Sequence, residues 1–461
     1  MIKSDTIAAI ATAMTSSGIG IIRISGDDAF QIAESIFEPK KKNKKISEQD
    51  TYTIHYGNIV DRDQILDEVI VLLMKGPHSY TAEDTVEIDC HGGVLVMKKI
   101  LELVIRKGAR PAEPGEFTKR AFLNGRIDLS QAEAVIDVIQ AKNEYALKSS
   151  VSQLKGSVLK KIKGIREKVL YEIAFIESAL DDPEHISLDG YAEELETKVE
   201  NLLQETERLL ITSEQGRVLR EGIRTVIVGK PNAGKSSLLN TLIGEDRAIV
   251  TDIAGTTRDT LEEQIQIRGL SLNIVDTAGI RETEDVVERI GVNKAKESLK
   301  DADLILYVVD SSTNMDKNDD EIIALLQDQD QNVIILLNKT DLESVTTAEM
   351  VQNCLNKPLI SISAKEETGI DEFADLLEEM FLHGNISFND EIYLTNLRHK
   401  TAMEEAKESL KKVLESISMG MPEDFFSIDL MNAYESLGMI LGESLGEDLV
   451  NEIFGKFCMG K

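Results

Sequence analysis

The middle of the chain carries short unbroken apolar runs, each followed by a polar motif. The runs lie at 225–228, 272–275, 304–309 and 333–337. Continuous apolar runs of this length, separated by segments long enough for helices, are typical of buried strands in a parallel sheet. The pattern therefore predicts a doubly wound α/β domain over residues 217–382.

Apolar residues at helical spacing flank this domain on both sides. One stripe recurs through Leu154, Val158, Ile162, Ile165, Val169, Ile173 and Ile176. It predicts one very long amphipathic helix, which Asp182 and Pro183 would end. A second helix is predicted from 191 to about 213, and a similar stripe runs from 397 to 417. The simplest topology is a helical bundle built from both flanks, with the α/β domain inserted in it.

The first part of the chain mixes strands and helices. Its apolar patterns predict strands at 20–24, 67–74 and 84–89, and helices at 28–37 and 94–106. A Pro- and Gly-rich segment after them indicates a boundary. The predicted segments are an N-terminal α/β domain at 1–119, a helical domain in two pieces at 120–216 and 383–461, and the α/β domain at 217–382.

Length and charge narrow the range of functions. A length of 461 residues suits about three domains. The formal net charge of −31 means that the chain as a whole repels nucleic acid. The basic stretch at 40–45 is most simply a solvated loop, with contact to RNA as the alternative.

Cysteine usage and apolar run length indicate a cytoplasmic protein. Cys90, Cys354 and Cys458 lack the spacing of a disulfide or metal framework, and the histidines form no zinc signature. The longest apolar runs are far shorter than the roughly 20 residues of a membrane span. No signal peptide is recognisable at the start. We therefore expect a reducing environment and no membrane segment.

The run at 225–228 leads into a phosphate-binding motif. Gly229, Gly234, Lys235 and Ser236 fit G-x-x-x-x-G-K-[ST], with a predicted strand before them and a helix after them. The backbone N–H groups of such a loop wrap phosphate, the lysine reaches the β- and γ-phosphates, and the hydroxyl binds Mg²⁺. The predicted nucleotide contacts are Asn232, Ala233, Gly234, Lys235, Ser236 and Ser237.

Two further motifs predict the parts that sense the γ-phosphate. In TDIAGTTRD at 251–259, Thr257 is placed to bind Mg²⁺ and to sense the γ-phosphate. In DTAG at 276–279, the aspartate would hold Mg²⁺ through water and the glycine N–H would meet the γ-phosphate. The predicted contacts are Thr251, Asp252, Ile253, Ala254, Gly255, Thr256, Thr257, Asp276, Thr277, Ala278 and Gly279.

The last two motifs predict the base. NKTD follows the run at 333–337, and its carboxylate would accept from both N–H groups of the guanine edge, which adenine does not offer. SAK follows a fifth short strand and would support the base. The predicted contacts are Asn338, Lys339, Asp341, Ser363, Ala364 and Lys365. Any one motif could be ordinary turn chemistry, but together and in this order they predict a GTPase domain.

The residue after the DTAG glycine restricts the hydrolytic mechanism. Ras-like proteins have a glutamine there that orients the attacking water. This chain has Ile280, which cannot do so, and sequence alone places no arginine finger. Either the water-orienting group comes from elsewhere, or the protein is a slow, binding-only GTPase.

With these motifs in place, the whole chain resembles the MnmE (TrmE) family of tRNA-modifying GTPases. The resemblance rests on DTIAAIAT and GIGIIRISG near the start, HGG at 91, the long match at 110–135, GKPNAGKSSLLN, TDIAGTTRD, DTAGIRET, NKTD and the terminal FCMGK. Taken alone, the tail would be interpreted as a frayed terminus. The resemblance replaces that interpretation for 457–461.

The resemblance implies a folate-binding N-terminal domain that also makes a homodimer. By position, Arg23, Glu87, Arg126 and Lys461 correspond to the family's folate site, with 5-formyl- or methylene-tetrahydrofolate as the implied cofactor. Arg126 stands where some members have lysine, so the charge is kept. Cys458 matches the family's terminal cysteine, and its chemical role stays open.

The resemblance also implies the reaction and its partners. The family works with the flavoprotein MnmG in a heterotetramer and adds a carboxymethylaminomethyl or aminomethyl group at C5 of the tRNA wobble uridine. Because of the charge of −31, tRNA contacts are expected mainly through the complex.

The missing hydrolytic groups are likewise implied by the family. Its members use K⁺, here expected at Asn232, Thr251, Ile253 and Thr256, to stabilise transition-state charge. Glu288 matches the family's catalytic glutamate, which positions the attacking water through a second water.

A function of another class stays open on the sequence alone. The chain could be a GTP-regulated switch that controls partner assembly, for example in ribosome biogenesis. The folate-like N-terminus and the Cys-x-Gly-Lys tail favour the modifying enzyme.

Overall fold

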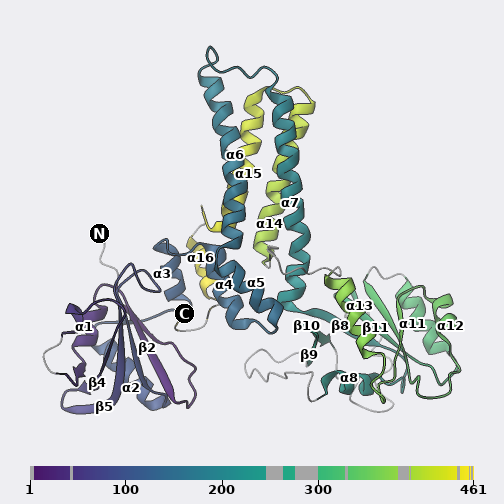
Figure 1. Cartoon of the computed structure of the whole chain (residues 1–461), viewed down its shortest axis with the longest axis horizontal. Coiled ribbons are helices and arrows are strands. Elements are labelled where there is room, and N and C mark those ends of the chain that lie inside the picture. The colour runs from purple at the N-terminus through teal and green to yellow at the C-terminus, as the bar shows by residue number, and fades with distance from the viewer. Residues whose placement is uncertain are drawn as a thin grey trace. The chain divides into compact units, whose positions relative to one another are not determined.

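The chain forms two compact units in the computed structural model (Figure 1). The structure describes residues 5–41, 45–244, 263–275, 299–327, 331–382, 394, 396–443, 447–455, 457 and 460. Unit 1 comprises Met1–Ile139, Gln153–Leu203 and Ala402–Lys461, and unit 2 comprises Gln140–Ser152 and Gln204–Thr401. The four domain boundaries expected from the sequence stay predictions.

Unit 1 begins with a seven-stranded sheet in the order β3-β4-β5-β6-β2-β1-β7. Its pairs are antiparallel except β1 with β7. The strands are β1 (Ile7–Ile10), β2 (Ile19–Ser25), β3 (Phe37–Pro39), β4 (Thr53–Asp61), β5 (Gln64–Met74), β6 (Thr85–His91) and β7 (Arg110–Pro111). The helices beside it are α1 (Ala29–Glu34), η1 (Ile46–Glu48) and α2 (Val94–Arg106).

The two faces of this sheet differ in character. Strand alternation sends Ile22 and Ile88 into a core shared with α2. On β2 and β6 the alternate positions include Arg23 and Glu87, which are register partners. The face opposite this core, the outer face, holds the polar cluster described below, in which the Arg23 and Glu87 side chains are 14% and 17% exposed.

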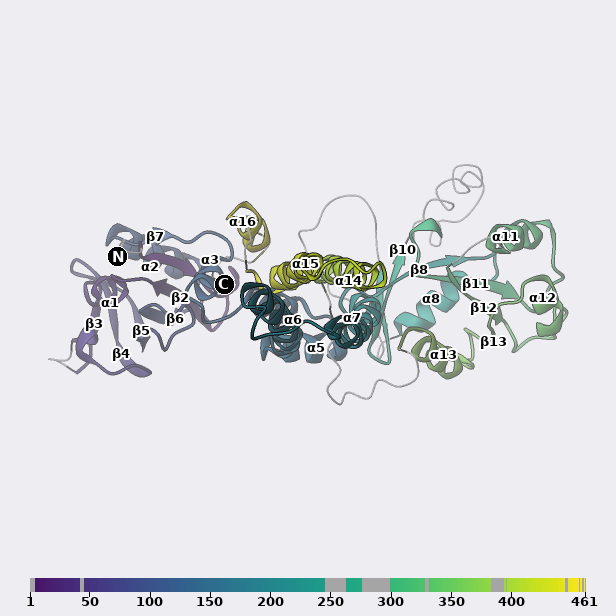
Figure 2. The same cartoon turned by 90° about the horizontal axis from the view of Figure 1, so that it is seen from above.

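The rest of unit 1 is helical. Its helices are α3 (Glu116–Leu123), α4 (Leu129–Gln140), α6 (Ser157–Asp181), α7 (Tyr191–Glu221), α14 (Leu397–Ser418), α15 (Glu423–Leu441) and α16 (Glu447–Gly455). Helices α7 and α14 are shared with unit 2, and α5 (Glu144–Leu154) lies mostly in unit 2. Figures 1 and 2 show α6 and α15 side by side along their lengths. The predicted stripe from Val158 to Ile176 is buried, which confirms a bundle helix. In the described part of the chain, every helix is too short or too polar to cross a membrane.

Three predicted helix boundaries are wrong. Leu154 ends α5, and the left-handed Gly156 (φ 87°) separates it from α6, so the apolar stripe spans two helices. Helix α7 continues to Glu221 rather than ending near 213. The predicted helix at 28–37 ends as α1 at Glu34, because Phe37 starts the edge strand β3. The break at Gly156 is a left-handed turn that glycine favours, and the spacing of apolar residues does not report it.

Unit 2 contains a six-stranded sheet in the order β13-β12-β11-β8-β10-β9, parallel except for the β9–β10 pair. Its strands are β8 (Ile223–Val228), β9 (Glu263–Ile267), β10 (Leu270–Val275), β11 (Leu304–Asp310), β12 (Asn332–Asn338) and β13 (Leu359–Ser361). Its helices include α8 (Lys235–Ile243), α11 (Lys317–Gln327), α12 (Ala348–Cys354) and α13 (Ile370–Leu382).

Separate apolar cores cover the two faces of the unit 2 sheet. Leu238 of α8 and Phe373 of α13 pack on one face, and Leu326 of α11 and Val351 of α12 pack on the other. Helices on both faces of a mostly parallel sheet confirm the predicted doubly wound class. This architecture brings the carboxyl ends of β8, β11 and β12 to one edge.

Candidate functional site

The phosphate-binding motif forms the turn between β8 and α8. Gly229 has φ 155°, and a Cβ there would lie 2.4 Å from the Val308 carbonyl oxygen. Gly234 has φ 96°, and a Cβ there would lie 2.2 Å from the Asn338 amide nitrogen. Neither position has room for a side chain, so the motif glycines are required by close backbone approach.

Lys235 lies folded over this loop. Its Nζ donates to the carbonyl oxygens of Gly229 at 2.7 Å and Lys230 at 2.8 Å. Burial lowers the pKa of the Lys235 amine. The ammonium is therefore held within the turn whose N–H groups are expected to wrap phosphate.

Asn338 joins three of the predicted motifs. Its amide Nδ2 donates to the Ala233 carbonyl at 3.0 Å, and its Oδ1 accepts from the Ala364 N–H at 3.1 Å. The side chain is 1% exposed. Because both ends of the amide are used, Asn338 fixes the phosphate loop, the NKTD turn and the SAK turn against one another.

Asp341 stands exposed at the rim of the same site. The Ser363 hydroxyl donates to its Oδ1 at 2.7 Å, and this hydrogen bond lowers the pKa of the carboxyl. The carboxylate is therefore ionised at neutral pH. Ser363 also accepts from the Glu366 N–H, which fixes the hydroxyl in the turn.

Lys339 connects the base motif to the phosphate loop from another direction. Its Nζ donates to the Asn232 carbonyl at 2.8 Å and to Asp310 Oδ2 at 2.6 Å. Burial pushes the pKa of Asp310 up, but the bonds from Lys339 and Ser312 outweigh it, and the pKa lies below its ordinary value. Asn232 has the left-handed φ of 62°, so this residue turns the loop at the point where Lys339 holds it.

Sequence reasoning missed a buried charge network behind the loop. Lys230 Nζ donates to Asp319 Oδ2 at 3.0 Å and to the Asn314 carbonyl at 3.1 Å, and the Tyr307 hydroxyl donates to Asp319 Oδ1. Burial, followed by the charge of Asp319, raises the pKa of Tyr307. The available signal was a lysine inside an otherwise small-residue loop, but nothing local pointed to its partner 89 residues away.

Several predicted residues lie outside the described part of the chain. They are Thr251, Asp252, Ile253, Ala254, Gly255, Thr256, Thr257, Asp276, Thr277, Ala278, Gly279, Glu288, Cys458 and Lys461. Their roles stay predictions.

A second polar cluster lies on the outer face of the N-terminal sheet in unit 1. Arg23 Nε donates to Glu87 Oε1 at 2.7 Å, and Arg23 Nη1 donates to the Gly460 carbonyl at 3.1 Å. The Arg23 guanidinium lies 5.3 Å from the Tyr80 ring centroid, and that of Arg126 lies 4.8 Å from it. Arg23, Glu87 and Arg126 are thus brought together, with Tyr80 between the two arginines.

This cluster is more than an isolated ion pair. Phe117 is fully buried 5.6 Å from the Arg23 guanidinium. Gly460 has φ 85°, and a Cβ there would lie 2.5 Å from the Ile10 carbonyl oxygen, so the tail packs closely against β1. The sequence contained no spacing signal for Tyr80 or Phe117, which enter through the fold.

Comparisons with known proteins cover the whole chain. Residues 129–458 match the family model described as the MnmE helical domain, and residues 6–126 match that of the GTP-binding protein TrmE N-terminus. The tRNA modification GTPase MnmE of Lachnoclostridium phytofermentans is 60% identical over 459 residues, which cover 100% of both chains. That of Clostridioides difficile is 50% identical over 462 residues, again covering 100% of both.

One solved structure is also similar in sequence. The G domain of the T. maritima FeoB iron transporter is 24% identical, and the match covers 35% of this chain and 98% of that one. Its TM-score of 0.25 is too low to show a shared fold.

Proposed function

This chain belongs to the MnmE family of tRNA modification GTPases and is a GTP hydrolase, and we propose that it couples GTP hydrolysis to modification of the wobble uridine of certain tRNAs at C5. The proposed product carries a carboxymethylaminomethyl or aminomethyl group. The proposed one-carbon donor is 5-formyl- or methylene-tetrahydrofolate, and the proposed partner is the flavoprotein MnmG.

The hydrogen bonds of Asn338 are the observation that carries the choice of nucleotide. This buried amide connects the phosphate loop at Ala233 with the SAK turn at Ala364, so phosphate and base are bound in one continuous site. The ionised Asp341 carboxylate at its rim can accept from both N–H groups of a guanine edge. Adenine does not offer that pair of donors, so the site selects GTP.

The phosphate loop suits the triphosphate and its metal ion. Lys235 exchanges its two carbonyl partners for phosphate oxygens when GTP binds. Ser236, in the first turn of α8, offers the hydroxyl that a P-loop uses for Mg²⁺. Bound Mg²⁺ would neutralise charge on the β- and γ-phosphates.

Asn232 supports the K⁺ part of the proposal. Its carbonyl is held by Lys339, and its exposed side-chain amide makes no hydrogen bond within the residues that the structure describes. The amide oxygen therefore fits a hard cation beside the loop. Bound K⁺ would stabilise charge that develops in the transition state, with further oxygens from Thr251, Ile253 and Thr256. Glu288 is the proposed residue that positions the attacking water, because Ile280 cannot.

The Arg23 cluster suits a reduced folate. A pterin is a flat ring with a guanine-like donor edge, and the folate tail is anionic. Glu87 can accept from such an edge, Tyr80 offers an aromatic face, and Arg23 and Arg126 offer positive charge. A bound folate would supply the one-carbon unit. Gly460 at the cluster supports including its neighbours Cys458 and Lys461 in this site.

The same outer sheet face supports the proposed homodimer. Ile19, Ile54, Tyr56 and Ile70 are between 41% and 67% exposed there. An apolar patch on a folded domain often marks an interface. Pairing of two such faces would bury these side chains beside Arg23 and Glu87.

The net charge of the chain supports the proposal that the partner makes most of the contacts with tRNA. A net charge of −31 disfavours extensive contact with phosphate, so most tRNA contacts are assigned to MnmG in a heterotetramer. The tRNA substrate is also the basis for proposing that the protein acts in the cytoplasm.

Mass spectrometry of tRNA nucleosides tests this function. A strain that lacks the gene should lose the C5-modified wobble uridines, and the wild-type gene should restore them. Complementation with Asp341→Asn should fail. An unchanged nucleoside profile in the deletion strain, accompanied by altered ribosomal subunit profiles, would instead favour the assembly switch and overturn the proposal.

A further inference from the structure

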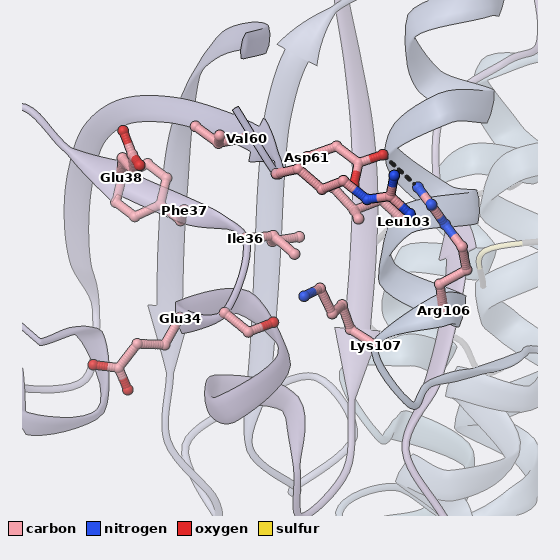
Figure 3. Close-up of a pocket in the computed structure, with 11 residues that line it drawn as sticks. Glu34, Ile36, Phe37, Glu38, Val60, Asp61, Leu103, Arg106 and Lys107 are labelled. Carbon is pink, nitrogen blue, oxygen red and sulfur yellow. Dashed lines mark hydrogen bonds and ion pairs between the residues drawn. The ribbon is translucent and has the colours of Figure 1, made fainter. Parts of the chain in front are cut away.

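A cavity of about 530 Å³ lies at the edge of the N-terminal sheet (Figure 3). It is bounded by the end of α1, by β3, by the β4–β5 hairpin and by the end of α2. Ile36, Phe37 and Leu103 provide apolar lining, and Arg62, Arg106 and Lys107 provide positive charge. The Arg23 cluster contributes none of its residues to this lining.

The cationic wall carries more positive charge than its one carboxylate can balance. Arg106 Nη2 donates to Asp61 Oδ2 at 2.7 Å. This hydrogen bond, with smaller contributions from the charges of Arg62 and Lys107, holds the pKa of Asp61 below its ordinary value. Within the described residues, Arg62 and Lys107 make no ion pair with any carboxylate. Asp61 thus faces three cations and is paired with one of them.

The other carboxylates of the cavity do not neutralise this wall. Glu34 accepts from the Ser47 hydroxyl at 3.0 Å, and in Figure 3 its carboxylate points away from Lys107. The Lys107 ammonium points toward the middle of the group, and Glu38 lies on the far side of it. The lining thus holds three carboxylates and three cations, and the cations are gathered at the ends of β4 and α2.

Arg62 lies in the turn of the β4–β5 hairpin. Arg62 and Asp63 are the two residues between β4 and β5, and Arg62 has the left-handed φ of 57°. Glycine, asparagine and aspartate are favoured at such positions. A two-residue hairpin turn requires this conformation, and the turn places the long cationic side chain of Arg62 at the cavity.

The geometry points to a phosphodiester of the tRNA backbone as the occupant of this wall. Guanidinium groups match the oxygens of phosphate, and lysine adds a point charge. The basic stretch at 40–45 begins directly after β3, whose Phe37 lines the cavity. A free phosphate compound would use only the cavity, whereas an RNA strand would reach the exposed Lys41 as well.

This proposal rests on the proposed function, and it changes the interpretation of the basic stretch. In a chain of net charge −31, most of the surface repels RNA. A local concentration of cations then determines where a strand can approach. Arg62, Arg106 and Lys107 form the cationic wall, and the exposed Lys41 follows β3, which borders the same cavity.

The salt dependence of tRNA binding to the full-length protein tests the proposal. The pocket variant carries Arg62→Gln and Lys107→Gln, and Arg106 is left intact because it pairs with Asp61. The matched control carries Lys98→Gln and Lys99→Gln, two exposed lysines of α2 outside the cavity lining. Both variants lose the same formal charge. GTP hydrolysis and thermal unfolding, measured in parallel, should be unchanged in both.

We expect the pocket variant to lower the slope of log K against log [salt] by about one unit for each phosphate that it no longer binds, and to weaken binding at low salt by roughly tenfold. The control should keep the wild-type slope. Equal effects in both variants would show that only the total charge of the protein matters, and would overturn the proposal. An unchanged slope in the pocket variant would overturn it as well.

A second arm separates RNA from small anions. Inorganic phosphate, titrated by calorimetry, should bind the wild-type protein weakly. Its affinity for the wild type should exceed its affinity for the pocket variant by no more than a few fold. Tight phosphate binding in the wild type together with an unchanged tRNA slope would assign the cavity to a free phosphate compound and overturn the RNA proposal. The proposed function is tested independently, by mass spectrometry of the tRNA nucleosides of the deletion strain.

Discussion

The two polar sites of this chain are assembled in opposite ways. In unit 2, the phosphate loop follows β8, and Asn338 ends β12, so each motif is a contiguous stretch beside a strand end. In unit 1, the cluster joins Arg23 of β2, Glu87 of β6 and the tail residue Gly460. One site collects loops at an edge, and the other collects single side chains across a face.

The difference follows from sheet topology. A doubly wound parallel sheet brings the carboxyl ends of its strands to one edge whatever its side chains are, so short local motifs can carry the chemistry. An antiparallel sheet brings Arg23 opposite Glu87 only through its register, and a one-residue slip would separate them. The first kind of site can therefore be recognised from short sequence motifs, whereas the second depends on how the strands pair.

The largest expected effect tests whether one motif residue decides the base. Asp341→Asn should lose the preference for GTP over xanthosine triphosphate by about 10⁴-fold, because the guanine N–H donors lose their acceptor. Titration with both nucleotides measures it, and Glu343→Gln, an exposed neighbour, is the control. If the wild-type protein bound ATP and GTP equally, the nucleotide assignment would be wrong.

A second change tests whether the unit 2 site also depends on a residue outside its sequence motifs. Lys230→Met should leave Asp319 buried without its cation and lower the free energy of unfolding of unit 2 by about 3–5 kcal/mol. Lys230→Arg should recover most of the loss. Denaturant unfolding followed by circular dichroism provides the measurement. A loss below about 1 kcal/mol in the methionine variant would show that the network is dispensable.

A third change tests Glu288, which lies outside the described part of the chain. Glu288→Ala should keep GTP binding and reduce turnover by about 10²–10³-fold, as the loss of a single positioning group does. Turnover should also be faster in K⁺ than in Na⁺. Steady-state phosphate release measures both, and equal rates in the two salts would count against the cation site at Asn232.

The fourth prediction addresses the site that the fold assembles. Glu87→Ala, and removal of the last five residues, should each weaken binding of 5-formyl-tetrahydrofolate by about 10- to 150-fold, the range for a hydrogen bond to a charged group. The GTPase rate should not change. Calorimetry measures the affinity, and Glu102→Ala on the exposed side of α2 is the control. Unchanged folate binding in both test variants would move the site elsewhere.

The smallest effect concerns the electrostatics of the unit 2 site. Because the pKa of Asp310 is lower in the folded state, its ionised form stabilises the protein above the unfolded pKa, near 3.9. That stabilisation is lost as the pH falls through the folded pKa. Asp310→Asn should therefore cost about 1 kcal/mol between pH 5 and 7 and progressively less below pH 4. Urea titrations across this range would contradict the assignment if the cost grew in acid.

More of the unit 2 site than of the unit 1 site could be predicted from the sequence. The parallel strands of unit 2 and the glycines of the phosphate loop were predictable, because buried parallel strands and positive-φ turns leave local signals. The antiparallel strand β9 was not predicted. Lys230 was not recognised, because its partner Asp319 lies on a separate helix. Tyr80 and Phe117 were also missed, since neither periodicity nor spacing reports which side chains a sheet face collects.

The helical boundaries show the same limit. The stripe through Leu154 continues in phase across Gly156, so spacing alone could not show that two helices share it. The extension of α7 to Glu221 was missed because its last turns lack a regular apolar stripe. The Arg23 site was reached only through family resemblance, which carries fold information that one sequence does not display.

The contact between Arg23 and Gly460 has a consequence for how the protein is made. The two residues are separated by 437 positions, so their hydrogen bond spans nearly the whole chain. At about 5–20 residues per second, a ribosome adds Gly460 roughly 20 to 90 s after Arg23. The N-terminal sheet can fold early, but this cluster stays incomplete until Gly460 has left the exit tunnel. A prematurely terminated chain could carry a folded GTPase domain and would still be without the hydrogen bond from Arg23 to the tail.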